Sequence, residues 1–463
     1  MVCIGVSMAV MDATAVIVAL PKIEAELGFT DTSFVWVLNA YLVCNSGFQL
    51  PGGRIADLFG HRRVFMWGLT TFTVASLGCA MATYRLEFLV ARAIQGLAAA
   101  VVGTAALPLI VRMFKDPRER ARAIGISGFA YSGAGIVGMA LAGLLTSVLS
   151  WRWIFLINVL IGPIAYATCR SLLPETRSRG SRHILVDMAG VVIIASALLV
   201  TIYGIGDINS SGWLSAQSLA ELTTVVVLLF AFRSLEHRNP TPLIPLALFQ
   251  RHDLVICCIS RLLVSVSGAA SVFVSLYMQN VLELSPMQVG LAMLPSSLVM
   301  STCAIGLSPR LVIRFGIKRS IALGLITVAS GFVLLARTSA AGSILWDVLP
   351  SQILIGAGSG IAFSPMTFAA LNDVSDDESG LISGLVITFS TFGCALWLAV
   401  LTSVSATHSG KLLALGRGVR ESLNTGYHTV FFIGALALCI ATAVTALLRT
   451  NMSAESRVDV EAS

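Results

Sequence analysis

The sequence predicts an all-α integral membrane protein, and three observations carry this prediction. Hydrophobic residues make up 56% of the 463 residues and charged residues only 12%, which is about half the charged share of a soluble domain. The mean hydropathy is +0.87. The apolar residues gather in runs of about 20, the length that a helix needs to cross a bilayer. Because these runs lack the alternation of barrel strands, we expect the elements that cross the lipid to be helices.

Fourteen such runs follow one another, and we interpret each as one membrane-spanning helix. The first run carries Asp12 and Thr14 and lacks the basic start of a signal peptide, so we keep it as a helix. The seventh and eighth runs are the least distinct as separate spans. The runs cover residues 1–20, 34–53, 64–83, 87–111, 123–147, 153–173, 187–206, 216–233, 254–279, 288–308, 320–338, 344–371, 380–405 and 429–448.

The charges of the loops predict the orientation. Of the 30 Lys and Arg residues, 21 lie in one set of alternate loops and the C-terminal tail, and 7 lie in the other set. The remaining two, Arg92 and Arg261, lie inside runs. Because Lys and Arg accumulate in cytoplasmic loops, we expect a multi-pass protein of the cytoplasmic (cell) membrane with both termini in the cytoplasm.

Composition and spacing exclude several functions. The basic loops account for the net charge of +6, so no nucleic-acid partner is expected. The nine cysteines are scattered without CxxC spacing, and neither a metal nor a cofactor is expected. No glycine-rich phosphate loop appears, so ATP is not expected to drive transport. His183 and Asp187 have the HxxxD spacing of some acyltransferases, but Asp187 suits a helix cap, and no catalytic residue is assigned.

Two connecting segments repeat each other. Both "GRIADLFGHRR" (53–63) and "PRLVIRFGIKR" (309–319) join two apolar runs on the basic side, and they agree at an offset of 256 residues. Paired halves around a central site are the architecture of secondary transporters. We therefore expect a six-helix bundle at 1–173, cytoplasmic linkers with two inserted helices at 174–253, a second six-helix bundle at 254–448 and a short cytoplasmic tail at 449–463.

Five motifs in order make the interpretation more specific. The chain resembles the fourteen-helix drug–proton antiporter branch of the major facilitator superfamily. The resemblance covers nearly the whole chain and implies that superfamily's fold, with two six-helix bundles plus two inserted helices. The motifs are "MDATAVIVALP" (11–21), "GRIADLFGHRR" (53–63), "ARAIQGLAAA" (91–100), "SWRWIFLIN" (150–158) and "GYHTVFFIGA" (426–435).

The sequence departs from that pattern at four positions. Met139 stands where antiporters of this branch have a proline, and Ala142 where the first of two paired glycines is expected. Ile17 replaces an asparagine, and Trp397 a second glycine. The changes at Met139, Ala142 and Trp397 fall on helices thought to flex or pack closely during export, so they bear on the coupling mechanism more than on the fold.

Arg92 and Gln95 lie inside the apolar run 87–111. A charged side chain near mid-membrane costs roughly 2.5–3.5 kcal/mol on insertion scales and normally faces the bundle interior or water. Gln95, three residues further on, shares that face. Arg92 could be a hydrogen-bonding hub between helices, but the resemblance implies a proton-relay or substrate-binding arginine. We favour the second interpretation and assign Arg92 to proton coupling and Gln95 to the substrate cavity.

Asp12 lies near the middle of the first run. It could be a satisfied structural acid, or it could carry the proton. Burial disfavours an ionised carboxylate and a nearby arginine favours it, so a group that alternates between these states can take up and release a proton. Both interpretations of Asp12 stay open, and we assign Asp12 to proton coupling with Arg92.

The repeated loop and an acidic segment suggest a gate. The resemblance makes loop 53–63 a cytoplasmic latch, and "NDVSDDESG" (372–380) is acidic on a side that is otherwise basic. Opposite charges there could meet when the cytoplasmic side closes. The residues assigned to gating are Gly53, Asp57, Gly60, Arg62, Arg63, Asp376, Asp377 and Glu378.

Further polar residues lie within the apolar runs. They are candidates for lining an apolar substrate cavity, although most polar residues in membrane helices form hydrogen bonds between helices. Arg261, about two turns into run 254–279, is expected to extend to the cytoplasmic interface. The candidates besides Gln95 are Asn39, Tyr41, Asn45 and Gln49 in run 34–53, and Tyr277 and Gln279 at the end of run 254–279.

These observations predict a proton-coupled secondary transporter that exports small amphipathic compounds by alternating access. Its expected partners are a small-molecule substrate, protons and the lipid bilayer. One alternative keeps the fold and is a proton symporter or facilitator of a small metabolite. A second alternative is a non-transporting membrane sensor or a membrane-bound enzyme, which the loop signature and the midplane charges disfavour.

Overall fold

The computed structural model describes the chain as two compact units. One comprises Met1–Leu246 with Ser285–Gly290, and the other comprises Ala247–Leu284 with Leu291–Ser463. Every regular element among the described residues is a helix. The described residues are 2–29, 34–113, 133–135, 137–172, 189–190, 192–194, 196–201, 203–204, 215–238, 248, 250–340, 342–371 and 376–448.

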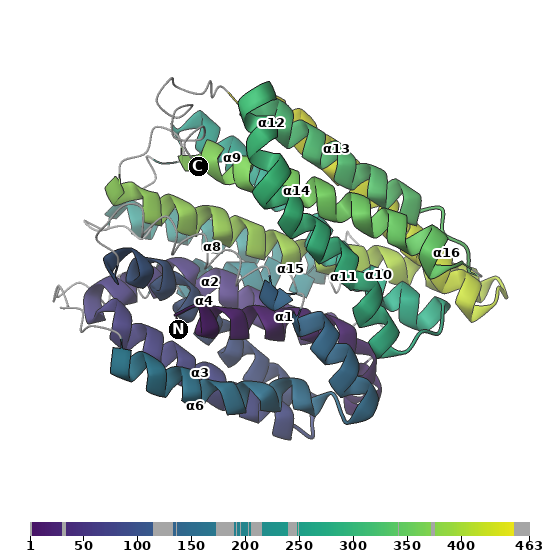
Figure 1. Ribbon diagram of the computed structural model, residues 1–463, viewed down its shortest axis with the longest axis horizontal. Coiled ribbons are helices and arrows are strands. Elements are labelled where there is room, and N and C mark those ends of the chain that lie inside the picture. Colours follow the sequence, from purple (N-terminus) through teal and green to yellow (C-terminus); the bar gives the residue numbers. More distant parts are fainter. Residues whose placement is uncertain are drawn as a thin grey trace. The chain divides into compact units, whose positions relative to one another are not determined.

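The first unit is built around four long helices that lie side by side in Figure 1. Helix α4 packs against α2 and α3, and α3 also packs against α6. Two shorter apolar helices, Gly133–Val148 and Val192–Thr201, belong to the same unit. The four long helices are α2 (Trp36–Phe59), α3 (His61–Met81), α4 (Arg85–Met113) and α6 (Arg152–Leu172). The unit also contains α1 (Val2–Leu27) and α8 (Ala216–Arg238).

The chain from His252 onward contains three short π-helical segments between its α-helices. Helix α13 packs against α14 and α16, while α9 packs against α14, α15 and α16. The elements are α9 (His252–Val264), α10 (Val266–Leu276), η2 (Tyr277–Val281), α11 (Pro286–Thr302), η3 (Cys303–Leu307), α12 (Ser308–Phe315), α13 (Ile317–Leu335), η4 (Ile344–Val348), α14 (Leu349–Leu371), α15 (Asp376–Ala414) and α16 (Val419–Ala446).

Each predicted run overlaps helical structure in the described residues. Ten helical stretches of the described chain are long and apolar enough to cross a bilayer. Helices α2 and α8 and the two shorter apolar helices coincide with the other four runs but are not among those ten. The all-helical architecture is therefore confirmed, and the count of fourteen membrane crossings stays a prediction.

Small residues let the helices approach closely. A Cβ atom built on Gly96 of α4 would lie 2.2 Å from the carbonyl oxygen of Tyr41 on α2, and one on Gly358 would lie 2.4 Å from the carbonyl oxygen of Gly324. In lipid, where no hydrophobic force drives helices together, such close backbone packing is a main source of association. The first contact brings Tyr41 against α4 one turn from Arg92.

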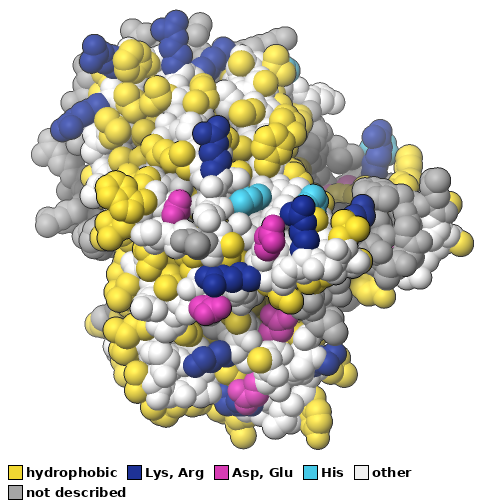
Figure 2. Space-filling model, turned by 90° about the vertical axis from the view of Figure 1, so that its right-hand side faces the viewer, with side chains coloured by type: hydrophobic (Ala, Val, Ile, Leu, Met, Phe, Trp, Pro, Cys, Tyr) yellow, Lys and Arg dark blue, Asp and Glu magenta, His cyan; other side chains and the backbone are white. Residues whose placement is uncertain are grey.

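Large apolar side chains cover much of the exposed surface. Figure 2 shows broad hydrophobic areas on the face it presents, with charged side chains in small groups. Exposed residues on the long helices include Val74 of α3, Ile164 of α6 and Phe432 of α16, each more than 60% exposed. Contiguous exposed apolar side chains are unfavourable in water. They suit helices whose outer faces contact lipid.

The two repeated segments adopt the same backbone turn. Gly60 joins α2 to α3 with φ of 91°, and Gly316 joins α12 to α13 with φ of 82°. In both cases the glycine carbonyl accepts the N–H four residues on, from Val64 and from Ser320. Glycine adopts positive φ without the steric cost that a Cβ atom brings, so the repeat reproduces a backbone requirement as well as a charge pattern.

We expect Gly60→Ala and Gly316→Ala to destabilise the protein by about 1–3 kcal/mol each. The open space around Gly316 makes backbone strain, and not a clash, the cause there. Thermal unfolding of the purified protein in detergent measures the effect. Gly103→Ala is the matched control, since Gly103 lies within α4 and a Cβ atom there would meet nothing within 4 Å. Equal melting temperatures for all three variants would contradict the prediction.

Candidate functional site

The carboxylate of Asp12 lies at the centre of a buried polar network. Asp12 is only 1% exposed, and Arg92 and Gln95 are fully buried. Arg92 Nη1 donates to Asp12 Oδ2 at 2.6 Å. Gln95 Nε2 and Asn158 Nδ2 each donate to Asp12 Oδ1 at 2.9 Å. Helices α4 and α6 therefore place three donors around the single carboxyl group that α1 carries.

Arg92 is held from several sides. Its Nε donates to the carbonyl oxygen of Val37 on α2 at 3.2 Å, and its Nη1 also donates to Gln95 Oε1 at 2.7 Å. The guanidinium carbon lies 4.5 Å from the centre of the Tyr41 ring and 5.8 Å from that of Phe155. A cation over an aromatic face is stabilised, most of all where water is excluded. Arg92 Nη2 is buried without a hydrogen bond among the described residues.

Helix α3 completes the network through Gln95. The amide Nε2 of Gln95 donates to Ser76 Oγ at 2.8 Å as well as to Asp12. Its Oε1 accepts a weaker contact from Cys79 Sγ at 3.7 Å. Because Ser76 and Cys79 are three residues apart on α3, they present one face of that helix to α4. The orientation of the Gln95 amide is thereby determined, with its oxygen toward Arg92.

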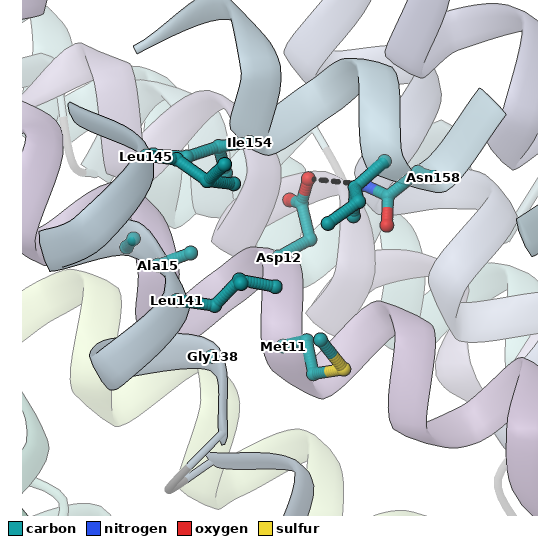
Figure 3. Close-up of a pocket in the computed structure, with 10 residues that line it drawn as sticks. Met11, Asp12, Ala15, Gly138, Leu141, Leu145, Ile154 and Asn158 are labelled. Carbon is teal, nitrogen blue, oxygen red and sulfur yellow. Dashed lines mark hydrogen bonds between the residues drawn. The ribbon is translucent and has the colours of Figure 1, made fainter. Parts of the chain in front are cut away.

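A small cavity adjoins the Asp12 carboxyl group. It has a volume of about 10 Å³, close to the space that one water molecule requires. Figure 3 shows Asp12 and Asn158 at this cavity, with apolar side chains from the helix Gly133–Val148 beside them. Ala142, where the resemblance leads us to expect glycine, is one of the lining residues. The cavity residues are Met11, Asp12, Ala15, Gly138, Leu141, Ala142, Leu145, Ile154, Ile157 and Asn158.

The hydrogen bonds around Asp12 fit the ionised form of its carboxyl group. An ionised carboxylate only accepts hydrogen bonds, and the three donors here match that state. A proton on the carboxyl group would remove the charge that balances Arg92. Removing one partner of a buried ion pair costs about 3–5 kcal/mol. Protonation of Asp12 would therefore weaken the connection between α1 and α4.

Four of the site residues predicted from the sequence lie together in the structure. They are Asp12, Arg92, Gln95 and Tyr41. Their transport roles stay predictions. Tyr41 stacks on Arg92, and its hydroxyl lies 3.5 Å from the carbonyl oxygen of Ala9 on α1.

Among the described residues, the other candidates on α2 make no hydrogen bond with the Asp12 network. Asn39 is buried, and its side-chain amide makes no hydrogen bond with the described residues. Gln49 Nε2 donates to Asn45 Oδ1 at 2.7 Å, one turn away on the same helix.

Tyr277 and Gln279 make contacts within the second unit. The Tyr277 hydroxyl donates to the carbonyl oxygen of Ser339 at 2.8 Å, and Gln279 Nε2 donates to Ser275 Oγ at 3.0 Å. Both are therefore part of local hydrogen bonding near η2. A role for either in a substrate cavity stays a prediction.

The proposed latch is described only in part. Arg62 donates through Nη2 to the carbonyl oxygen of Arg170 at 2.6 Å, at the end of α6, while Arg63 is exposed. Gly53 lies within α2 and Gly60 at its end. The side chains of Asp57, Asp376, Asp377 and Glu378 lie outside the described residues, and the last three residues begin α15.

The prediction for Arg261 is wrong. The side chain was expected to extend to the cytoplasmic interface, but it is only 5% exposed. Its Nη2 donates to the carbonyl oxygen of Phe363 at 3.1 Å and to Thr367 Oγ1. Those acceptors lie on α14, so Nη2 of the guanidinium is bonded to a neighbouring helix of the same unit.

Sequence reasoning missed Asn158, Ser76 and Cys79 as members of the site. Asn158 was noted only within the motif "SWRWIFLIN". A signal was present, because an amide inside the apolar run 153–173 is costly unless it bonds within the bundle. Ser76 and Cys79 carried no such signal, since small polar residues are common in membrane helices.

We expect Asn158→Leu to destabilise the protein by about 1.5–3 kcal/mol, the usual value of a hydrogen bond to a charged group, and to slow transport. The change removes one of the three donors to Asp12. Thermal unfolding and transport in reconstituted vesicles measure the two effects. Thr168→Val on the same helix is the control, because Thr168 bonds only to backbone oxygens of its own helix. If Asn158→Leu and Thr168→Val have the same melting temperature and the same transport rate, Asn158 does not stabilise the network.

Comparison with known proteins agrees with this architecture. The sequence matches the Major Facilitator Superfamily over residues 2–398. It is 33% identical over 456 residues to the puromycin resistance protein pur8 of Streptomyces alboniger, covering 96% of this chain and 90% of that protein. It is 34% identical over 411 residues to the cephamycin export protein CmcT of Amycolatopsis lactamdurans, covering 88% and 84%.

Solved structures support the fold independently. An auto-inhibited peptide transporter of the POT family matches with a TM-score of 0.67 at 15% identity, covering 98% of this chain and 97% of that one. The human organic anion transporter MFSD10 matches with a TM-score of 0.61 at 15% identity, covering 94% and 97%. With the family match over most of the chain and two relatives above 30% identity, the chain belongs to the major facilitator superfamily.

Proposed function

We propose that this protein is a proton-coupled exporter of small amphipathic compounds that works by alternating access. The observation that carries the proposal is the buried network in which Asp12 accepts from Arg92, Gln95 and Asn158. An acid and a base buried in a membrane helix bundle are costly and usually functional. We further propose that the chain crosses the cell membrane fourteen times, with both termini in the cytoplasm.

We propose that the network couples transport to the movement of protons. In one state Asp12 is ionised and α1 is bound to α4 through Arg92. In the other state Asp12 carries a proton, Arg92 turns to its remaining acceptors, and α1 is free to shift. The small cavity between α1, α6 and helix Gly133–Val148 adjoins the carboxyl group, and we propose that it is the place where water delivers the proton.

The substrate class is inferred from relatives and from composition. The similar proteins are named for puromycin resistance and for cephamycin export, and both names refer to antibiotics. The long helices provide apolar surface with few polar groups, which suits amphipathic compounds. We therefore propose antibiotics and similar amphipathic molecules as substrates, moved outward in exchange for protons.

Transport in inside-out vesicles tests the function. A panel of fluorescent dyes and antibiotics that includes puromycin is added outside vesicles from cells that express the protein, and a pH gradient is imposed across the membrane. We expect uptake into the vesicles that a protonophore abolishes, with proton release from the lumen for each substrate moved. Vesicles that carry the Asp12→Asn variant are the control.

The same measurement separates the alternatives. Net movement of the compound with protons, in the same direction, would identify a symporter. Movement of the compound at a rate that does not depend on the pH gradient would identify a facilitator. A chain that moves no compound of the panel under either gradient, while correctly inserted, would contradict export and favour a sensor or an enzyme.

A further inference from the structure

Arg261 is a second buried arginine, and its surroundings differ from those of Arg92. Both recorded hydrogen bonds of Arg261 leave from Nη2 and reach neutral acceptors, the Phe363 carbonyl oxygen and Thr367 Oγ1. The guanidinium carbon lies 4.3 Å from the centre of the Phe363 ring. Nε is buried and makes no hydrogen bond with the described residues.

The charge of Arg261 has no carboxylate partner among the described residues. Ion pairs in that part of the chain join Arg92, Arg152, His252, Arg417 and Arg420 to acids, but none includes Arg261. A buried charge is normally neutralised by an opposite charge. The carbonyl and hydroxyl groups and the aromatic ring around Arg261 stabilise its charge through partial charges only, without an opposite full charge.

The repeat makes the contrast sharper. Under the repeat that relates residues 53–63 to 309–319, α9 is the counterpart of α1 and α14 is the counterpart of α4. In the first half these two helices carry Asp12 and Arg92, which neutralise each other at 2.6 Å. In the second half the same helix pair carries Arg261 and Thr367, and no carboxylate among the described residues pairs with the positive charge.

The neighbouring side chain suits an amphipathic ligand. Phe363 is 51% exposed although its ring contacts the guanidinium. An apolar surface therefore continues directly from the cationic group. A molecule with one anionic group and an apolar tail could place the anion on the guanidinium and the tail along Phe363, with the charge-assisted hydrogen bonds that arginine forms with carboxylate and phosphate.

We propose that Arg261 is an anion-binding subsite, which takes the carboxylate or phosphate group of an amphipathic molecule. The subsite uses the guanidinium of Arg261, whose Nε makes no hydrogen bond with the described residues, and the exposed ring of Phe363. It does not depend on the direction of transport or on proton coupling, and its test is therefore a binding measurement that stands apart from export.

The primary test is equilibrium binding of radiolabelled dodecanoate at pH 8 to the full chain in phosphatidylcholine nanodiscs. We expect saturable binding that Arg261→Gln weakens at least tenfold. Arg314→Gln is the matched control, because Arg314 is exposed in the same unit and also lies near a phenylalanine ring, and it should bind as wild type does. Dodecyltrimethylammonium, with the same tail and a positive head, should not compete.

A second pair of variants covers the case in which Arg261→Gln does not fold. Thr367→Glu would supply an internal carboxylate at the hydroxyl that now bonds Arg261, and it should abolish dodecanoate binding. Thr367→Gln has nearly the same shape without the charge and should keep binding within a few-fold. Size-exclusion chromatography and thermal unfolding establish that each variant compared is folded.

A third arm identifies the source of the anion. Native mass spectrometry of protein taken from nanodiscs that contain phosphatidylglycerol measures lipid retention. Retention that is lost in Arg261→Gln or Thr367→Glu would assign the subsite to a lipid headgroup, and dodecanoate binding without such retention would assign it to a free amphipathic anion. Wild-type binding and wild-type lipid retention in folded Thr367→Glu would overturn the proposal and leave Arg261 as a connection between α9 and α14.

Discussion

The Asp12→Asn variant is expected to lose proton-driven export entirely, to the level of vesicles without the protein, and still to reach the membrane. Arg92 donates to one carboxylate oxygen of Asp12, and Gln95 and Asn158 donate to the other. Asparagine keeps only one acceptor oxygen, so part of the network retains its partner and part loses it. Asparagine cannot bind and release a proton, so the step that separates the ionised state from the protonated state disappears. The largest loss is therefore expected in transport, with a smaller loss in stability from the missing charge.

Two transport assays distinguish this outcome from simple misfolding. Export against a gradient, driven by an imposed pH difference, should vanish in Asp12→Asn. Exchange of labelled for unlabelled substrate without a pH difference should continue, because it needs the alternation of the bundles but no net proton movement. Glu87→Gln is the control, since Glu87 is exposed at the start of α4 and caps that helix through Thr83 and Tyr84. Normal gradient-driven export by Asp12→Asn would remove Asp12 from the mechanism.

The second large effect is expected at Arg92. Arg92→Ala leaves the Asp12 carboxylate buried with only two amide donors, and breaking a buried pair in this way costs about 3–5 kcal/mol. It also removes the bond to the Val37 carbonyl and the contact with Tyr41, so α2 loses its connection to the network. We expect low yields of folded protein and no measurable export.

Arg92→Lys should retain some activity. A lysine keeps the charge near Asp12, but it presents a single ammonium group in place of the planar guanidinium that reaches Asp12, Gln95 and the Val37 carbonyl together. Thermal unfolding and export are measured on both single variants. If Arg92→Ala exports as wild type does, the arginine has at most a structural role.

A double variant separates stability from coupling. Asp12→Asn introduced into Arg92→Ala removes the uncompensated carboxylate, so part of the lost stability should return. Export should remain absent, because the proton carrier is gone. Recovery of export together with stability would mean that the pair serves only to hold α1 against α4.

Much of the fold could be predicted because membrane insertion is governed by local composition. Apolar runs of bilayer length form helices wherever they occur, since no other open structure satisfies their backbone groups in lipid. The repeat of segments 53–63 and 309–319 was visible in the sequence, and their shared glycine turn has the same physical origin in both. Arg92 and Asp12 were conspicuous because charge is rare in apolar segments.

The sequence by itself determined where helices form, which loops repeat, and that Asp12, Arg92 and Gln95 would avoid lipid. Only the tertiary structure decided which groups they meet. Asn158 bonds Asp12 because α6 packs against α1, and Ser76 bonds Gln95 because α3 packs against α4. Which faces meet depends on packing between helices far apart in the chain. Arg261 could have extended to water or turned inward, and the position of α14 beside α9 made the inward contact available.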